Sequence, residues 1–425
     1  MSEKVVIRCC NCKDCIEEPD DCDMSDRITC PTCRETWTRM FWITPDFQFD
    51  PQFAVSEKER IEMRERVAKF AGCLMLCVAM LFVGCKSAEQ GSETVVEVKE
   101  VPQFSLAWSE YPSWSAFGVA HEVGILNGEA GKQSELEKKW GVDVVLLEKD
   151  YDTCIQYAST GTEDAACLTN IDILAPSLGR PMRFVLPTST SNGADAVISV
   201  ETTNVTDLKG KDVYGLAQTV SEYLFERGLE IKGQNPADYS FKGMDPAVAA
   251  QSMVTNSPNV KNICVWNPFK MSTLEKRDDA KVVFDSTLIT GEIIDGVGVG
   301  EDSLKREGGE NFCRCICEAY YEVCQLLNNE ATRDKTLVML GAKFSDLEAD
   351  KMAICTEETK FYDTPEAGEA LLDNRSEGAL LQDTMNRVVK FCVDKGVCTT
   401  EPVVTFGKPK SNSNLTFDSS YLKSK

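Results

Sequence analysis

The sequence has almost no histidine and a deficit of positive charge. Its 425 residues include one histidine, His121, and 45 Lys and Arg against 68 Asp and Glu, which gives a formal net charge of −23. Nucleic-acid binding requires a basic surface, so no nucleic-acid partner is expected. The stretch FGVAHEVGIL indicates a helix in which His121 packs or lies at the surface rather than acting as a general base. We therefore expect no enzymatic activity.

The N-terminal part also lacks an apolar run long enough to cross a membrane. Residues Phe70–Gly84 are uncharged, but these fifteen residues fall short of the roughly 20 that a spanning helix needs. Basic residues precede the run, and FVGC at 82–85 resembles the lipobox of bacterial lipoproteins, whose cysteine is acylated. We expect 63–85 to be a lipoprotein signal peptide with Cys85 as the lipidation site, followed by a polar tether, 86–100. A transmembrane anchor or a buried core helix is the alternative.

Seven of the twenty cysteines lie within residues 1–42, ahead of this signal. Two C-x2-C pairs can together complete a tetrahedral Zn²⁺ shell, and ITCPTCRETW resembles the second knuckle of a zinc ribbon. The expected zinc ligands are Cys9, Cys12, Cys30 and Cys33, although Cys12 with Cys15 offers a competing first pair.

The position of this segment has two explanations. Residues 1–42, joined to the signal by a linker at 43–62, can be a cytoplasmic appendage. Alternatively, Met63 is the natural start and residues 1–62 are an extension, because Met63 gives a signal peptide of ordinary length.

After Cys85, about 340 residues remain, which is enough for two domains or lobes. Strand and helix patterns alternate from residue 103 onward, which predicts an α/β fold with parallel sheets. The pattern changes near 190 and returns near 290, so the chain should pass twice between lobes and form a hinge. We expect lobe 1 at 101–190 plus 291–400, lobe 2 at 191–290 and a C-terminal tail at 401–425.

Ten cysteines follow Cys85. Four of them lie in CRCICEAYYEVC (313–324), which indicates a helix whose thiols are buried in the core. Cys392 and Cys398 are spaced to close a short disulfide loop.

Several motifs, in order along 101–375, carry a family resemblance. LAWSEYPSW, CLTNIDILAPSLGRP, LPTSTSNGADAVI, DLKGKDVYGLAQTVSEYLFERGLE, VWNPF and VVFDSTLITGEIIDGVGVGEDSLK resemble substrate-binding proteins of ABC importers. The resemblance is to the nitrate/taurine-type branch of the type II periplasmic binding fold, and it looks closest to the subgroup associated with urea carboxylase and guanidine degradation. The resemblance implies an exported, membrane-anchored protein that needs no cofactor and delivers a small solute to a permease driven by an ATPase. The N-terminal cysteine-rich segment is absent from that family.

In open α/β sheets, ligands bind beyond the carboxyl ends of strands. The residues that follow the predicted strands, on loops matching the family's ligand contacts, give the expected binding site: Ser109, Tyr111, Trp114, Thr169, Asn170, Asp172, Ser189, Ser191, Gln218, Ser221, Trp266, Asn267, Glu292 and Asp295. Glu110 and Glu222 lie on the same loops.

The character of these residues favours a cation or a neutral solute. Trp108, Trp114 and Trp266 are suited to stack on a planar ligand, and the four acids Asp172, Glu222, Glu292 and Asp295 suit a guanidinium group through paired hydrogen bonds. Nitrate or taurine would need Arg or Lys, and the nearest candidates are Arg180 and Arg183. The expected solute is therefore small, polar and nitrogenous, with urea and guanidine favoured over taurine and nitrate.

Two other functions remain alternatives. The same fold hosts enzymes such as a thiamin-pyrimidine synthase, and the Cys313, Cys315 and Cys317 cluster would be its candidate chemistry. A membrane-anchored solute sensor with a cytoplasmic zinc module is the other, although the sequence contains no output domain.

Overall fold

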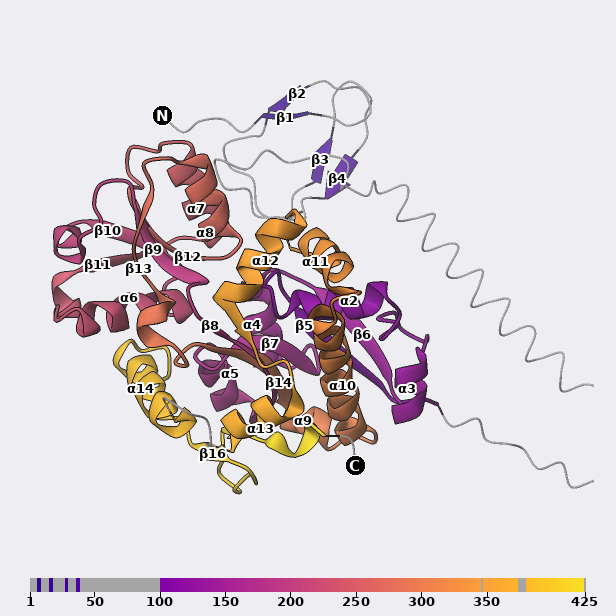
Figure 1. The fold of residues 1–425 in the computed structure, drawn as a ribbon. Helices are drawn as coiled ribbons and strands as arrows, with labels where there is room; N and C mark the ends of the chain where they lie inside the picture. Colours follow the sequence, from indigo (N-terminus) through magenta and orange to yellow (C-terminus); the bar gives the residue numbers. More distant parts are fainter. Residues whose placement is uncertain are drawn as a thin grey trace, which may run out of the picture. The chain divides into compact units, whose positions relative to one another are not determined.

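The computed structural model describes residues 100–344, 347–373 and 380–423, together with four short strands near the N-terminus. The chain divides into two compact units, residues 1–97 and 98–425. In the first unit, β1 (Val6–Arg8) pairs antiparallel with β2 (Cys15–Glu17), and β3 (Arg27–Thr29) pairs antiparallel with β4 (Thr36–Thr38) (Figure 1).

Several predictions fall on residues outside this description. The four expected zinc ligands, the apolar run and Cys85 are among them. Among the described residues, no helix is both long enough and apolar enough to cross a membrane.

Lobe 1 is built on a sheet in which three parallel strands stand side by side. These are β6 (Asp143–Glu148), β5 (Gln103–Trp108) and β7 (Ala165–Thr169), in that order. Strand β14 (Ile294–Gly300) lies antiparallel between β7 and β8 (Met182–Ser191). All five residues of β7 and all seven of β14 are buried, so these central strands have apolar or small residues on both faces.

Lobe 2 repeats the same arrangement with five strands. The order is β11 (Ser240–Gly243), β10 (Asp212–Gly215), β12 (Asn262–Trp266), β9 (Asp195–Ser199) and β13 (Lys281–Asp285). Here β9 is the antiparallel strand, between β12 and β13. In Figure 1 these strands gather at one end of the unit formed by residues 98–425.

The two antiparallel strands are also the two passages between the lobes. The chain enters lobe 2 from β8 into β9, and it returns from lobe 2 into β14. The expected double passage is confirmed, and each lobe contains one strand that belongs to the hinge. The two crossing segments are hydrogen-bonded to each other, since the backbone N–H of Ser191 donates to the carbonyl of Ile293 at 3.2 Å.

Helices cover both sheets, and their ends carry ordinary stop and start signals. Helix α7 begins with Asp245 as its cap and Pro246 in its first turn, while α3 begins with a capping box formed by Ser134 and Glu137. The helices are α2 (Ser115–Glu122), α3 (Glu135–Trp140), α4 (Tyr151–Thr160), α5 (Leu174–Gly179), α6 (Val220–Ile231), α7 (Pro246–Val254), α8 (Phe269–Lys276), α9 (Glu301–Leu304), α10 (Gly309–Asn328), α11 (Arg333–Ala342), α12 (Ala349–Glu358), α13 (Pro365–Leu372) and α14 (Leu381–Asp394).

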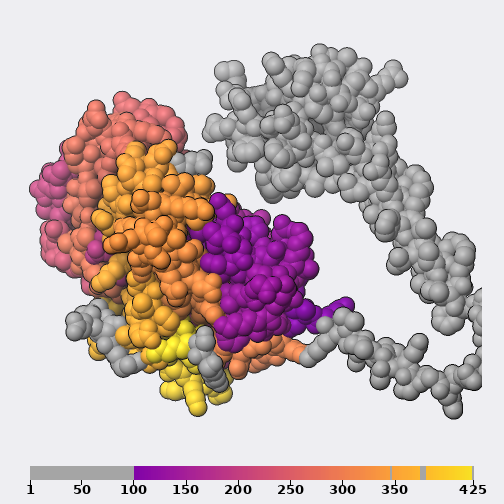
Figure 2. All heavy atoms as spheres, turned by 45° about the vertical axis from the view of Figure 1, so that its right-hand side comes forward, coloured from indigo at the N-terminus to yellow at the C-terminus, as the bar shows by residue number. Residues whose placement is uncertain are grey.

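The C-terminal third of the chain touches both lobes. Figure 2 shows the C-terminal helices (orange) between the early part of lobe 1 (purple) and lobe 2 (magenta to salmon). Glu358 at the end of α12 accepts a 2.6 Å hydrogen bond from the ammonium of Lys270 in α8. The segment 401–425, expected as a tail, contributes β16 (Val404–Phe406) and β17 (Leu415–Phe417) to the lobe 1 sheet, and β15 (Thr359–Phe361) pairs with β8.

The cysteine-rich stretch forms the helix that its sequence predicted. Cys313, Cys315, Cys317 and Cys324 lie in α10, all at most 1% exposed. Burial raises the pKa of each of these thiols, which keeps them protonated. They are core residues.

Candidate functional site

A small buried cavity lies where the two lobes meet. Its lining residues come from loops and strand ends of both lobes: Tyr111, Trp114, Tyr151, Thr169, Asp195, Val220, Trp266, Ile293 and Asp295. Its volume is about 20 Å³, which is room for one or two water-sized groups. We call this space the inner cavity.

The repeated topology of the lobes places two aspartates in equivalent positions. In lobe 1, Asp295 of the antiparallel strand pairs with Thr169, the last residue of the third parallel strand. In lobe 2, Asp195 of the antiparallel strand pairs with Trp266, the last residue of the corresponding strand. Each passage between the lobes therefore carries one carboxylate into the inner cavity.

Aromatic rings form the walls of the cavity. Trp114 lies between Tyr111 and Tyr151, with ring centroids 4.9 and 5.3 Å away, and Tyr151 meets Trp266 edge-on at 6.0 Å. The hydroxyl of Tyr111 and the indole N–H of Trp114 are buried and have no hydrogen-bond partner among the described residues. The wall is thus apolar over most of its area, with two donors still to be satisfied.

Burial acts on both carboxylates of the cavity, and the charge of Asp195 also acts on Asp295. Burial raises the pKa of Asp195 to about 6, although the Ser191 hydroxyl and the Lys270 ammonium oppose the rise. Burial, together with repulsion from Asp195, raises the pKa of Asp295 well above its usual value, against the 2.6 Å hydrogen bond donated by Ser189. The site is short of positive charge, and a cation placed between the two acids would relieve both effects.

Asp172 lies behind the lining residues. Its carboxylate accepts hydrogen bonds from the hydroxyls of Tyr151 at 2.7 Å and Thr169 at 3.0 Å, and burial raises its pKa to about 6. Asp172 thereby orients two residues that do line the cavity.

Other predicted residues hold the crossing segments together. The side chain of Asn170 donates to the carbonyl of Glu292 and accepts from the N–H of Ile294, which ties the end of β7 to the return passage. The hydroxyl of Ser191 shares a hydrogen bond with that of Ser286 and accepts from the backbone of Asp195.

Asn267 and Ser221 are buried residues of lobe 2 that do not line the inner cavity. Asn267 donates to Glu358 at 2.7 Å, and its side-chain oxygen has no described partner. The buried hydroxyl of Ser221 is likewise without one.

The other two predicted acids are paired with basic side chains outside the cavity. Glu292 accepts hydrogen bonds from Tyr223 and Arg227 and lies 3.4 Å from Arg387. Glu222 accepts from Lys395 at 2.8 Å and from the backbone of Gln218 at 2.7 Å.

The remaining candidates also lie away from the cavity. Trp108 packs against Gly118 of α2 in the lobe 1 core. Arg180 pairs with Asp302, and Arg183 pairs with Glu301 and Asp418, around the amino end of β8. His121 is exposed near the end of α2. The residues that line the inner cavity therefore include no Lys, Arg or His.

A larger cleft of about 670 Å³ adjoins the cavity and shares Tyr151 and Trp266 with it. One lysine, Lys149, and Ser109 line this cleft. Five acidic residues also line it: Glu110, Glu148, Asp150, Asp152 and Asp245. Asp150 and Asp245 also cap the first turns of α4 and α7. The acidic side chains that line this cleft favour the approach of cations and disfavour that of anions.

Sequence reasoning missed Asp195, Tyr151, Val220 and Ile293, because it took positions after predicted strands and on loops that match the family's ligand contacts. Asp195 and Ile293 lie at strand beginnings, and Tyr151 and Val220 each open a helix. The signal that could have found Asp195 is its likeness to Asp295, since each stands near the start of a strand that follows a lobe crossing.

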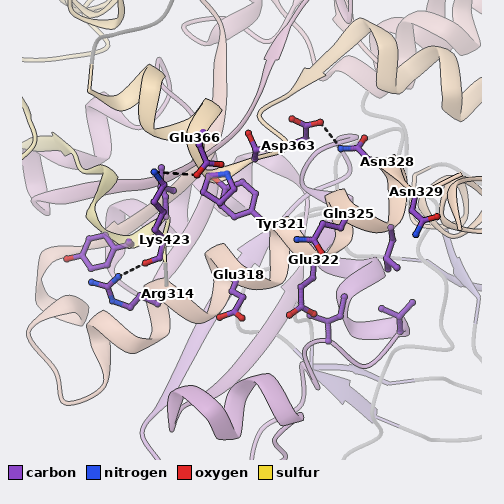
Figure 3. A pocket seen from close by; sticks show the side chains of 17 residues that line it. Arg314, Glu318, Tyr321, Glu322, Gln325, Asn328, Asn329, Asp363, Glu366 and Lys423 are labelled. Atoms are coloured by element: carbon purple, nitrogen blue, oxygen red, sulfur yellow. Dashed lines mark hydrogen bonds and ion pairs between the residues drawn. The ribbon is translucent and has the colours of Figure 1, made fainter. Parts of the chain in front are cut away.

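A wider groove of about 1300 Å³ runs beside α10 within lobe 1, away from the lobe boundary (Figure 3). Its charged side chains largely pair with one another or with the backbone. Lys423 lies 3.4 Å from Glu366, Arg314 donates to the carbonyl of Lys423, and Asn328 donates to Asp363 (Figure 3).

No family model matches the sequence, and no curated protein matches it either. Solved structures do match. The periplasmic aliphatic sulphonate binding protein SsuA from Escherichia coli has a TM-score of 0.54 at 15% identity, covering 70% of this chain and 89% of that one. The alkanesulfonate-binding protein SsuA from Xanthomonas axonopodis pv. citri, bound to MOPS, has 0.54 at 13% identity, covering 70% and 95%.

A third similar structure is the CA3427 gene product of Candida albicans, described as showing the generic periplasmic binding protein fold. It has a TM-score of 0.51 at 14% identity and covers 70% of this chain and 92% of that one. Identities this low establish the fold alone. With the two sheets and the double crossing, they show that the chain from about residue 101 onward adopts the two-lobed α/β fold of type II periplasmic binding proteins.

Proposed function

We propose that this protein is the solute-binding component of an ABC importer and that it captures a small nitrogenous solute, guanidine-like or urea-like, between its lobes. The observation that carries the proposal is the inner cavity. Two buried carboxylates meet there from the two crossing strands, aromatic rings enclose them, and no basic side chain lines the space.

The charge of the cavity separates this solute from those of the similar structures. Two of those structures are named as sulfonate-binding proteins. An anion placed beside Asp195 and Asp295 would meet like charge in a dry site, which costs several kcal/mol. A guanidinium ion can instead donate paired hydrogen bonds to a carboxylate while its flat face lies against an aromatic ring.

The dimensions of the cavity also support a very small solute. About 20 Å³ is little space even for a planar group of four heavy atoms, so entry requires the lobes to separate slightly. The 670 Å³ acidic cleft supplies the route. An alkyl chain such as that of taurine would need a deeper opening than a guanidine or urea.

Guanidinium and urea are a matched pair of probes because they share shape and size and differ in charge. In a thermal-shift screen of residues 98–425, each is added at low millimolar concentration, well below denaturing levels, alongside taurine and nitrate. A ligand at 100 times its dissociation constant adds about 2.7 kcal/mol to the free energy of unfolding, which is easily measured. We expect guanidinium to stabilise most, urea less, and the anions not at all. Stabilisation by taurine or nitrate alone would overturn the proposal.

The proposal includes the anchor and the N-terminal segment. Acylation at Cys85 would tether the binding domain to the outer face of a membrane. There it would deliver solute to a permease that a cytoplasmic ATPase drives. If translated, residues 1–62 would bind Zn²⁺ through Cys9, Cys12, Cys30 and Cys33. Intact mass measurement of the protein purified from membranes tests the anchor and shows whether the N-terminal segment is retained, since cleavage and acylation at Cys85 remove the first 84 residues and add lipid. An unacylated chain that retains them would favour a membrane-anchored sensor.

A further inference from the structure

Two cysteines bracket a tight turn at the end of α14. The chain leaves the helix through Lys395 and Gly396, which adopts a positive φ of 68°, and turns back so that the N–H of Cys398 donates to the carbonyl of Cys392 at 3.0 Å. A backbone hydrogen bond of that length limits the two Cα atoms to at most about 7 Å apart, near the upper end of the range that a disulfide spans. Both side chains are buried, and both are free thiols.

The two thiols influence each other's protonation. The neighbouring Cys392 thiol lowers the pKa of the Cys398 thiol, while the pKa of Cys392 itself is raised. For the other eight described cysteines beyond residue 100, burial raises the thiol pKa, so Cys398 differs from all of them. The thiolate is the attacking species in disulfide exchange. Cys398 lies directly beneath an exposed turn, flanked by exposed Gly396 and Thr399.

Lys395, which lies between the two cysteines, forms contacts between the two lobes. The ammonium of Lys395 pairs with Glu222 at 2.8 Å and also with Glu226, both on α6 of lobe 2. Its carbonyl accepts a 3.2 Å hydrogen bond from the side chain of Gln218. Helix α6 begins at Val220, which lines the inner cavity. The turn between the cysteines, which belongs to lobe 1, therefore contacts the lobe 2 helix α6, whose first residue lines the cavity.

We propose that Cys392 and Cys398 form a reversible disulfide that fixes the Lys395 turn and thereby stabilises the contact between α14 and α6. With the disulfide closed, the turn cannot unwind from the helix end, so Lys395 stays in reach of its two glutamates. With the thiols reduced, the turn opens more readily and the contact is released more often.

The chemistry is ordinary exchange with a small external disulfide. The Cys398 thiolate attacks one sulfur of oxidised glutathione and expels one glutathione thiolate, which gives a mixed disulfide. The Cys392 thiol then loses its proton and attacks the Cys398 sulfur, expelling the second glutathione. The protein loses two electrons and two protons, and one oxidised glutathione becomes two reduced ones.

Peptide mapping of the full chain tests the bond directly. The protein is equilibrated with mixtures of reduced and oxidised glutathione, quenched with acid, alkylated and digested with trypsin. Cleavage after Lys390, Lys395 and Lys410 separates FCVDK from GVCTTEPVVTFGKPK. A disulfide joins these two peptides into one species that reducing agent splits. We expect the joined species to increase with the oxidised fraction and to be absent in Cys392→Ser and Cys398→Ser, while Cys355→Ser retains it.

Native proteolysis tests the effect on the turn. We expect trypsin to cut the folded, oxidised protein after Lys395 several-fold more slowly than the reduced protein. In the double variant Glu222→Gln/Glu226→Gln, the disulfide should still form, but most of that protection should be lost. If the two peptides stay separate at every glutathione ratio, the proposal fails. It also fails if they join and cleavage after Lys395 is unchanged. Neither readout depends on the solute, so failure here leaves the proposed transport function to its own test.

Discussion

Replacing Asp195 with asparagine should weaken cation binding and at the same time stabilise the empty protein. Asp195 stands at the start of β9, lines the inner cavity and is 4% exposed. Asparagine keeps its shape but removes its charge. A structural residue would show loss of binding together with loss of stability, so the opposite signs identify a binding carboxylate.

The expected loss of affinity follows from Coulomb attraction in a closed site. Two unit charges about 4 Å apart interact by about 4 kcal/mol at an effective dielectric constant of about 20. Breaking one such contact in a dry interface costs about 2–5 kcal/mol, which corresponds to roughly 30- to 4,000-fold weaker binding. The expected gain in stability comes from the raised pKa of Asp195, about 6 against an ordinary 3.8. At neutral pH this shift corresponds to about 3 kcal/mol, a contribution that asparagine would recover in part.

Calorimetry with guanidinium and thermal unfolding of the empty protein measure the two effects. Asp418→Asn is the matched control, because Asp418 is a buried aspartate paired with Arg183 at 3.0 Å, away from the cavity. We expect Asp418→Asn to lower the melting temperature and leave guanidinium affinity unchanged. If Asp195→Asn binds guanidinium as tightly as the unaltered protein, the assignment of the inner cavity as a cation site is refuted.

Three further predictions concern the same framework. Burial raises the folded-state pKa values of Asp172 and Asp195 to about 6, so their favourable contribution to stability is complete below pH 3.8 and is lost as the pH rises through 6. The empty protein should therefore become less stable from pH 4 to 7, while its affinity for guanidinium increases. Opposite trends in melting temperature and calorimetric affinity over this pH range would contradict the charges assigned here. Asp172→Asn, which acts through Tyr151 and Thr169, should weaken guanidinium binding less than Asp195→Asn does, and an equal or larger loss in calorimetry would place Asp172 in direct contact with the solute. Gly296→Ala should destabilise by about 1–3 kcal/mol in thermal unfolding, because an added Cβ would stand 2.3 Å from the Phe184 ring and 2.4 Å from the Leu186 carbonyl in the middle of the lobe 1 sheet, and a neutral result would mean that β14 can shift there.

The sequence predicted the fold well where local pattern and burial agree. Strand β7 occupies Ala165–Thr169, where a short run of small apolar residues between turns is typical of a buried strand in an α/β chain. Helix α10 was recognised because three of its cysteines repeat at helical spacing. Strands β16 and β17 were missed because each has three residues and gains its stability from β8, far away in the sequence.

The site was harder to predict because its charges are decided by distant partners. Glu222 has no basic neighbour in its own loop, yet Lys395, 173 residues away, pairs with it. Glu292 likewise obtains Arg227 from a helix 65 residues earlier in the chain. Sequence reasoning could identify acids near strand ends but could not tell which of them folding would neutralise. Asp195 and Asp295 differ because both lie deep at the crossing strands, where the described residues that line the cavity include no basic side chain and nearby Lys270 is paired with Glu358.

The position of Asp195 and Asp295 on the two connecting strands links recognition to motion. A solute that engages both carboxylates fastens the two segments about which the lobes must turn, so tight capture and slow release come from the same bonds. Under the proposed function, substitutions that adjust selectivity at either aspartate would therefore also change how quickly the solute is released. The same proposal implies that tighter binding at these aspartates slows release, whereas changes on the aromatic wall or at the outer rim would not act on the connecting strands directly.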